Sequence, residues 1–162
     1  MAIVQQETFS IEDLIKSLRA NNPSIGAVVT FTGYVREFDP NKTNKKLSKL
    51  HIEHYPEMTI KALIKIEQCA KKNWNITAVQ IIHRYGLLEP NEPIVGVIVL
   101  SEHRDEAFDA CRFVIDYLKT EAPFWKKELT SKGGYWVERK VGDESNTKKW
   151  QSKLQDCKTK VS

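Results

Sequence analysis

The residues best placed to do chemistry in this sequence are two lysines, Lys119 and Lys126, in the segment DYLKTEAPFWKKE. Lys119 falls at the end of an expected helix, and Lys126 follows on an expected strand that starts after Pro123. Two ammonium groups held close together disfavour each other's charge, and the neighbouring Phe124 and Trp125 would exclude water. One amine could then be neutral near pH 7 and act as a base or nucleophile. The alternative is a pair of solvated lysines, which is the commoner situation at such positions.

Lys127 and Glu128 extend this candidate site. Because side chains alternate along a strand, Lys126 and Glu128 are expected on one face, and Trp125 and Lys127 on the other. Glu128 could hold Lys126 in place through an ion pair. A plain surface ion pair, the alternative, contributes at most ~1 kcal/mol.

A second group of candidate residues surrounds the start of an expected helix. The segment Ser101-Glu102-His103-Arg104 joins a buried strand to this helix, whose free backbone N–H groups and dipole favour an anion. His103 and Arg104 would add donors for a phosphate or carboxylate, and Arg36 at the end of another strand could converge on the same place. Arginines in the first turn of a helix are more often solvated, so the pattern alone does not establish a site.

Other catalytic and metal-binding patterns are missing from the sequence. The expected strands contain three histidines, His51, His54 and His83. None has a cysteine or carboxylate at metal-ligand spacing, which favours core or surface histidines. The cysteines are Cys69, Cys111 and Cys157. They form no CxxC pair and are expected to be reduced thiols, and no HExxH, Ser-His-Asp or P-loop pattern is present. We therefore expect neither a metal nor a cofactor.

The positive charge is concentrated at the C-terminal end. The chain has a formal net charge of +4, and the segment from Arg139 to Ser162 contains seven Lys or Arg against three acids. The rest is therefore neutral overall, which argues against a nucleic-acid-reading domain, although a basic tail can bind polyanions weakly. No apolar run approaches the ~18 residues that span a bilayer, and the first residues lack signal-peptide regions, so a cytoplasmic protein is expected.

Helical and strand patterns alternate along the chain and predict one α+β domain over residues 1–142. Helices are expected at 11–18, 56–73 and 104–119. Ser10 and Asp13 resemble a capping box at the start of the first helix, and Pro123 is expected to end the third. Strands are expected at 25–35, 50–55, 76–83, 93–100, 124–129 and 135–140, with a hairpin turn at 131–134 between the last two. The polar segment 37–49 is expected to be a mobile loop, and residues 143–162 a basic, flexible tail with Trp150 as its docking point.

Six segments, in this order, resemble one known family. They are GAVVTFTGYVR (26–36), LHIEHYPEMT (50–59), IIHRYG (81–86), SEHRDEAF (101–108), DYLKTEAPFWKKE (116–128) and YWVER (135–139). The chain is similar in these segments to the catalytic (large) subunit of molybdopterin synthase, the MoaE family. The segment 37–49 is longer and more basic than this family leads us to expect, and the chain extends past the usual end after Trp150.

The resemblance implies an α/β hammerhead fold, with a mixed antiparallel sheet and packed helices. It also implies a homodimer that binds a small ubiquitin-like sulfur-carrier subunit at each end, giving a heterotetramer. The C-terminal Gly-Gly of that partner carries a thiocarboxylate, whose sulfur would be transferred to cyclic pyranopterin monophosphate to build the dithiolene of molybdopterin. The cysteines of this chain would then not carry sulfur.

The resemblance also implies a set of site residues. The substrate-binding residues would be Tyr34, Val35, Arg36, His103, Arg104, Lys119, Lys126, Lys127 and Glu128. Lys119 would have the main catalytic role and Lys126 a supporting one, because both reactants are anions that need positive groups in a shielded site. Two other functions remain open from the residues: a non-catalytic module that binds a ubiquitin-like tail, and a nucleic-acid binder that uses the basic tail.

Overall fold

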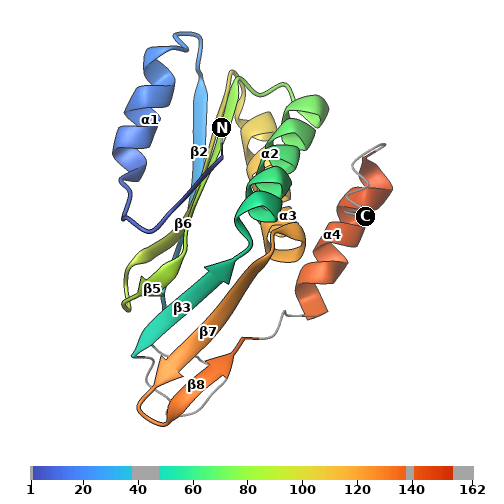
Figure 1. Cartoon of the computed structure of the whole chain (residues 1–162). Coiled ribbons are helices and arrows are strands. Elements are labelled where there is room, and N and C mark those ends of the chain that lie inside the picture. The colour runs from blue at the N-terminus through green and yellow to red at the C-terminus, as the bar shows by residue number, and fades with distance from the viewer. Residues whose placement is uncertain (1, 38–47, 138–140, 155–162) are drawn as a thin grey trace.

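Two four-stranded sheets and four helices make up the described part of the chain, residues 2–37, 48–137 and 141–154 of this computed structural model (Figure 1). The prediction of a single-domain α+β fold is confirmed. The strands, however, are divided between two sheets rather than joined in one. Most of the expected loop 37–49 lies outside the described residues, as does the end of the tail.

The first sheet has the strand order β1-β4-β6-β2. Its strands are β1 (Ile3–Gln5), β4 (Ala78–Arg84), β6 (Pro93–Ser101) and β2 (Ala27–Tyr34). β1 is parallel to β4, and the other neighbours are antiparallel. The two central strands are almost entirely buried, as the nearly continuous apolar run of β6 predicts for that strand.

The second sheet has the order β5-β3-β7-β8 and is antiparallel throughout. Its strands are β5 (Gly86–Leu88), β3 (Lys49–His54), β7 (Phe124–Thr130) and β8 (Gly133–Trp136). Thr130 pairs with Gly133, so Ser131 and Lys132 form a two-residue hairpin turn. Gly133 has a φ of 126°, which a glycine adopts without strain.

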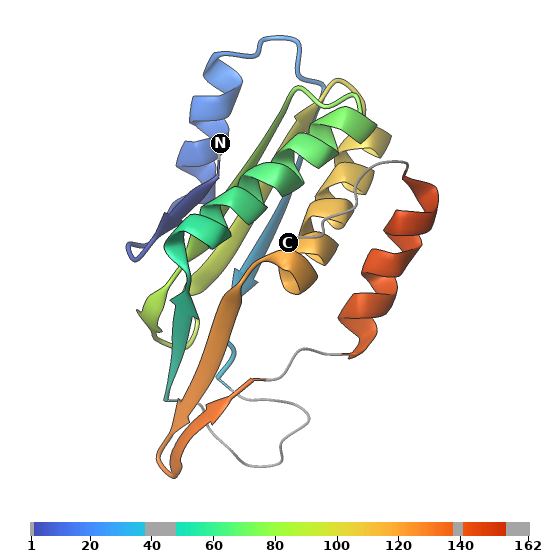
Figure 2. The same ribbon diagram turned by 45° about the vertical axis from the view of Figure 1, so that its right-hand side comes forward.

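Three helices cover the first sheet. They are α1 (Ile11–Ala20), α2 (Pro56–Asn73) and α3 (Arg104–Glu121). The Ser10 hydroxyl accepts a hydrogen bond of 3.2 Å from the Asp13 amide, so the predicted cap of α1 is confirmed. α2 and α3 pack together on one face of the sheet, and α1 lies on the opposite side (Figures 1 and 2).

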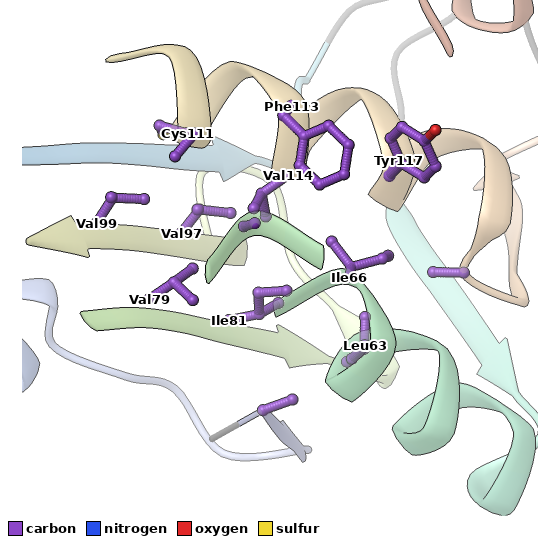
Figure 3. Close-up of a cluster of buried hydrophobic side chains, with 14 of the residues drawn as sticks. Leu63, Ile66, Val79, Ile81, Val97, Val99, Cys111, Phe113, Val114 and Tyr117 are labelled. Atoms are coloured by element: carbon purple, nitrogen blue, oxygen red, sulfur yellow. The ribbon is translucent and has the colours of Figure 1, made fainter. Parts of the chain in front are cut away.

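The main core lies between the first sheet and the helices α2 and α3. Figure 3 shows its central side chains, which include Leu63 and Ile66 of α2, Val97 and Val99 of β6, and Phe113 of α3. A smaller cluster under the second sheet consists of Val35, Leu50, Ile52, Leu88 and Ile94. Phe124 packs against both clusters and therefore connects the two parts of the fold.

A fourth helix, α4 (Val141–Lys153), occupies part of the segment that we expected to be a flexible tail. The Trp150 indole N–H donates a hydrogen bond of 2.8 Å to Asp116 of α3. Its ring also meets Trp74 and Phe113 edge to face, with centroids 5.6 and 5.7 Å away. Trp150 is therefore the docking point of this segment, and it holds a helix against α3.

Candidate active site

Lys126 lies on the inner face of the second sheet. In the register of β3 with β7, Lys126 is opposite Ile52, and Glu128 is opposite Leu50. Ile52 and Leu50 are 1% and 6% exposed, so this face covers the smaller core cluster. Lys126 and Glu128 are both half-buried and share this face, as the alternation of the strand predicts.

Lys127 points to the opposite face of the same strand. Its Nζ lies 5.4 Å from the centre of the Trp136 ring, a cation–π contact across the β7–β8 hairpin. Trp125 shares this outer face and is half-exposed. Within one chain, the side chains of Lys126 and Lys127 therefore cannot belong to the same pocket wall. A substrate-binding role for Lys127 remains a prediction.

Lys119 lies exposed in the last turn of α3. The helix ends at Glu121, because Pro123 keeps Ala122 out of helical geometry, and Ala122 has extended dihedral angles of −77° and 126°. β7 then starts at Phe124. The connection between the two elements is thus only two residues long, and the two candidate lysines lie on either side of it.

The segment Tyr34–Arg36 leaves β2 beside the second sheet. Val35 is 2% exposed and packs in the cluster that contains Leu50 and Ile52. Its amide donates to the Glu92 carbonyl at 2.9 Å, and its own carbonyl accepts from Asn91 at 2.8 Å. Val35 therefore anchors the segment, while the side chains of Tyr34 and Arg36 are exposed. This places Arg36 on the same side of the molecule as β7.

His103 and Arg104 lie at the N-terminal end of α3, where buried contacts fix the chain. The Ser101 hydroxyl is fully buried, donates to the Asn75 carbonyl at 3.0 Å and accepts from the His103 amide at 3.3 Å. The Gly26 amide donates to the Ser101 carbonyl at 3.1 Å. The side chains of His103 and Arg104 are 73% and 84% exposed, on a turn that these hydrogen bonds fix.

The candidate residues therefore form two groups rather than one. Arg104 and Lys119 are fifteen residues apart on α3, which corresponds to about 22 Å at 1.5 Å per residue. The sheet shows the same separation, because Ala27 pairs with Ser101 near the start of α3, whereas Tyr34 pairs with Pro93 at the other end of β6. One chain brings Arg36, Lys119, Lys126 and Glu128 to one end of the fold and His103 and Arg104 to the other.

Two histidines beside Lys126 were expected only as core or surface residues. His83 is 5% exposed, and its ring stacks on Phe124 with a centroid distance of 3.7 Å and an interplanar angle of 13°. Burial, and then the charge of Lys126, lowers the pKa of His83 to about 3. Burial also lowers the pKa of His54, which stacks on Phe124 from β3 at 6.0 Å. In the sequence, the only indication of a role for His83 was that it is a polar residue in an expected strand of mostly apolar residues.

The described cysteines offer no activated thiolate. Cys111 is buried and free, and burial raises the pKa of its thiol to about 11. Cys69 is disulfide-bonded, so the expectation of a reduced thiol is wrong for this residue. Cys157 lies outside the described residues.

In the described ranges, no group of three His, Cys, Asp or Glu residues could hold a metal ion, and no helix is long and apolar enough to cross a membrane. A pocket of about 400 Å³ between α3 and α4 is lined by Asp109, Arg112, Asp116, Asn146, Lys149 and Trp150. It contains none of the candidate residues.

Comparison with known proteins points to one family. Residues 4–121 match the family model described as MoaE protein, a match that includes Lys119 and ends before Lys126. The chain is 49% identical over 152 residues to the molybdopterin synthase catalytic subunit of Pseudomonas aeruginosa, covering 93% of this chain and 99% of that protein. It is 46% identical over 147 residues to that of Ralstonia nicotianae, covering 91% and 82%.

Solved structures agree with these relatives. The molybdopterin biosynthesis MoaE protein from Burkholderia ambifaria has a TM-score of 0.78 and 42% identity, covering 93% of this chain and 97% of that one. The molybdopterin synthase from Staphylococcus aureus has a TM-score of 0.75 and 33% identity, covering 84% and 96%.

Proposed function

The chain belongs to the MoaE protein family, the relatives that it matches are molybdopterin synthase catalytic subunits, and on this premise we propose which residues carry out the sulfur transfer. The reaction moves sulfur from a thiocarboxylated partner to cyclic pyranopterin monophosphate and forms the dithiolene of molybdopterin. Lys119 has the main catalytic role, and Lys126 supports it. Arg36 and Glu128 lie on the same end of the fold and complete this half of the site.

The observation that carries the proposal is the short connection between α3 and β7. It holds Lys119 and Lys126 on consecutive, well-packed elements, while Phe124 between them is fixed in both core clusters. Both reactants are anions, so a wall of lysine and arginine side chains favours their binding and stabilises charge that develops in the transition state. Rigid support of this kind keeps charged groups in a reactive geometry.

In the proposed reaction, the thiocarboxylate sulfur attacks a carbon of the pterin side chain and displaces an oxygen substituent of that carbon, which gives a thioester between the pterin and the partner. Water then cleaves the bond between sulfur and the acyl carbon, so the sulfur stays on the pterin and the partner leaves with a carboxylate C-terminus. Lys119 transfers a proton or stabilises the acyl intermediate, and Lys126 stabilises the developing negative charge. Cysteine sulfur takes no part, which agrees with the buried, weakly acidic thiol of Cys111. No cofactor is required by this scheme.

His103 and Arg104 reach the same pocket only from a second copy of the chain. They are about 22 Å from Lys119 along α3, yet both are highly exposed at a helix N-terminus that favours an anion. A twofold homodimer in which the two α3 helices lie side by side and antiparallel would place the start of one near the end of the other and would produce two equal sites. The pterin phosphate would then lie between residues of both copies.

The sulfur donor in this proposal is a small ubiquitin-like subunit with a C-terminal Gly-Gly thiocarboxylate. One such subunit at each end of the homodimer gives the heterotetramer. Exposed side chains of Tyr34 and Arg36 and the exposed Lys119 leave the end of the fold near β7 open to an extended tail. A location in the cytoplasm also remains a proposal, and cell fractionation with activity measurements would test it.

Reconstitution tests the function. The purified protein, mixed with thiocarboxylated partner and cyclic pterin phosphate, should form the dithiolene product, and Lys119→Ala should abolish it without loss of the fold. A non-catalytic module that binds a ubiquitin-like tail would bind the partner and form no product even with Lys119 present. Near-normal turnover by the Lys119→Ala variant would refute the assignment of Lys119.

A further inference from the structure

The joint between the two sheets is an aromatic stack beside Lys126. His83, at the end of β4 in the first sheet, lies face to face with Phe124, the first residue of β7 in the second sheet, at 3.7 Å and 13°. From the second sheet, His54 of β3 stacks on Phe124 at a centroid distance of 6.0 Å and lies 4.5 Å from the ring of Tyr85. Phe124 thus contacts a histidine of each sheet.

The hydrogen bonding of His83 defines its chemical state. Its Nδ1 lies 2.7 Å from the Arg84 carbonyl oxygen, and a carbonyl can only accept, so Nδ1 carries the proton. Burial, the charge of Lys126 and the proximity of His54 all lower the pKa of the ring. His83 is therefore a neutral imidazole with one fixed tautomer and one fixed orientation.

Lys126 is connected to this stack by the geometry of the strand. It lies two residues after Phe124 on the same face of β7, opposite Ile52, and its charge acts on His83. A shift or rotation of the Phe124 ring would change the path of the first residues of β7, and Lys126 would move with them. A small displacement of a charged group in an active site lowers the rate strongly.

We propose that His83 is a positioning residue for Lys126, and that it acts through its stack on Phe124. The inference rests on the proposed role of Lys126, but the placement of the lysine by His83 can be measured without turnover. A neutral ring suits this position, because a charged group there would repel the ammonium group that it positions.

Two substitutions separate the effect of the ring stack on Lys126 from the effect of side-chain packing in general. His83→Leu keeps an apolar side chain of similar size but removes the flat ring, whereas His83→Phe keeps a ring that can stack on Phe124. His51→Leu is the matched control, because His51 is on β3 opposite Lys127, on the other face of the sheet. These three substitutions leave Lys119 and Lys126 in place, and each variant is assayed at a temperature at which it is folded.

The first measurement is the NMR signal of the Lys126 side chain in protein labelled with 13Cε-lysine, assigned by its loss in Lys126→Ala. His83→Leu should shift or broaden this signal, His83→Phe should return it toward the native position, and His51→Leu should leave it unchanged. A native signal in His83→Leu, or a His83→Phe signal no closer to native than that of His83→Leu, would overturn the inference. This readout stays decisive even if reconstitution shows that the lysine is not catalytic.

The second measurement is kinetic. His83→Leu should lower kcat about tenfold, with the KM for the thiocarboxylated partner changed by less than about twofold, and His83→Phe should recover kcat to within about threefold. In a Lys126→Ala background, His83→Leu should cause no further loss, because the group that it positions is gone. An equal loss in both backgrounds would show a structural role and contradict the inference. If His83→Leu does not fold, Phe124→Leu removes the same stack from the other side and must shift the Lys126 signal in the same way.

Discussion

His103 and Lys119 are carried by the same helix, α3, but they lie at its opposite ends. His103 is the residue just before the helix, and Lys119 is in its last turn. Because a helix is rigid over this length, no side-chain movement brings the two groups to one small substrate within a single chain. A shared function for both ends of α3 therefore requires two copies of the chain.

Mixed dimers test this arrangement. Arg104→Ala and Lys119→Ala should each be nearly inactive alone, because each removes a group from both sites of the dimer. When the two variants are mixed and allowed to exchange subunits, each mixed dimer contains one intact site and one that lacks both groups. With random exchange, activity should return to about a quarter of the native value, measured as dithiolene product per subunit.

The control for this experiment mixes Lys119→Ala with Lys126→Ala. These residues come from the same end of one chain, so every site in the mixed dimer lacks one of them and activity should stay low. Recovery in this control, or no recovery for Arg104→Ala with Lys119→Ala, would contradict a pocket shared between two copies.

The opposite faces of β7 lead to a second prediction. Lys126→Ala should lower kcat by about tenfold or more, equivalent to at least ~1.4 kcal/mol of transition-state stabilisation. Lys127→Ala should change kcat by less than about threefold and lose only the contact with Trp136, about 0.5–1 kcal/mol of stability. Steady-state kinetics and urea unfolding of both variants give the comparison. Equal losses of kcat would mean that Lys127 also reaches the substrate, as the family resemblance implies.

Local patterns predicted the elements around the site well. The Ser10 cap, the stop of α3 before Pro123 and the hairpin at Ser131–Gly134 follow from chemistry within a few residues, and all are present. The alternation along β7 likewise gave the correct faces for Lys126 and Lys127. These predictions needed no information about distant parts of the chain.

The arrangement of distant residues could not be predicted in this way. β1 and β5 have three residues each, too few for a periodic pattern, and the division into two sheets depends on pairings between distant segments. The stack of His83 on Phe124 joins two such segments, and α4 lacks a strong apolar stripe and is docked mainly by Trp150. The family resemblance placed His103 and Lys119 in one pocket, and only the fold shows that these residues lie at opposite ends of α3 within one chain.

The docking of α4 gives a third prediction. Trp150→Phe should cost about 1 kcal/mol, since the ring contacts remain and only the hydrogen bond to Asp116 is lost. Trp150→Ala should cost about 2–3 kcal/mol, because the half-buried ring also leaves Trp74 and Phe113. Urea unfolding measures both losses. Limited proteolysis should cleave α4 faster in Trp150→Ala, and an unchanged cleavage rate would show that other contacts hold the helix.

The buried histidines predict how stability depends on pH. The pKa of His83 is lowered from 6.5 to about 3 in the folded protein, so below pH 6.5 the unfolded chain takes up a proton that the folded chain does not. The contribution of His83 to stability is therefore complete above pH 6.5 and is lost as the pH falls toward 3, by at most ~1.4 kcal/mol per pH unit. His54 acts in the same direction, because burial lowers its pKa as well.

His83→Phe isolates this effect, because a phenyl ring cannot bind a proton. Between pH 6.5 and 5, the native protein should lose up to about 2 kcal/mol more stability than this variant. Burial raises the pKa of Glu67, which opposes the loss at lower pH, but this residue is the same in both proteins and cancels in the difference. Urea unfolding at several pH values gives the slopes, with His51→Phe as a control for changing a histidine at the partly exposed outer face. If the unfolding free energies of the native protein and His83→Phe change in parallel with pH, His83 can be protonated in the folded protein. The assignment of a neutral imidazole beside Lys126 would then be wrong.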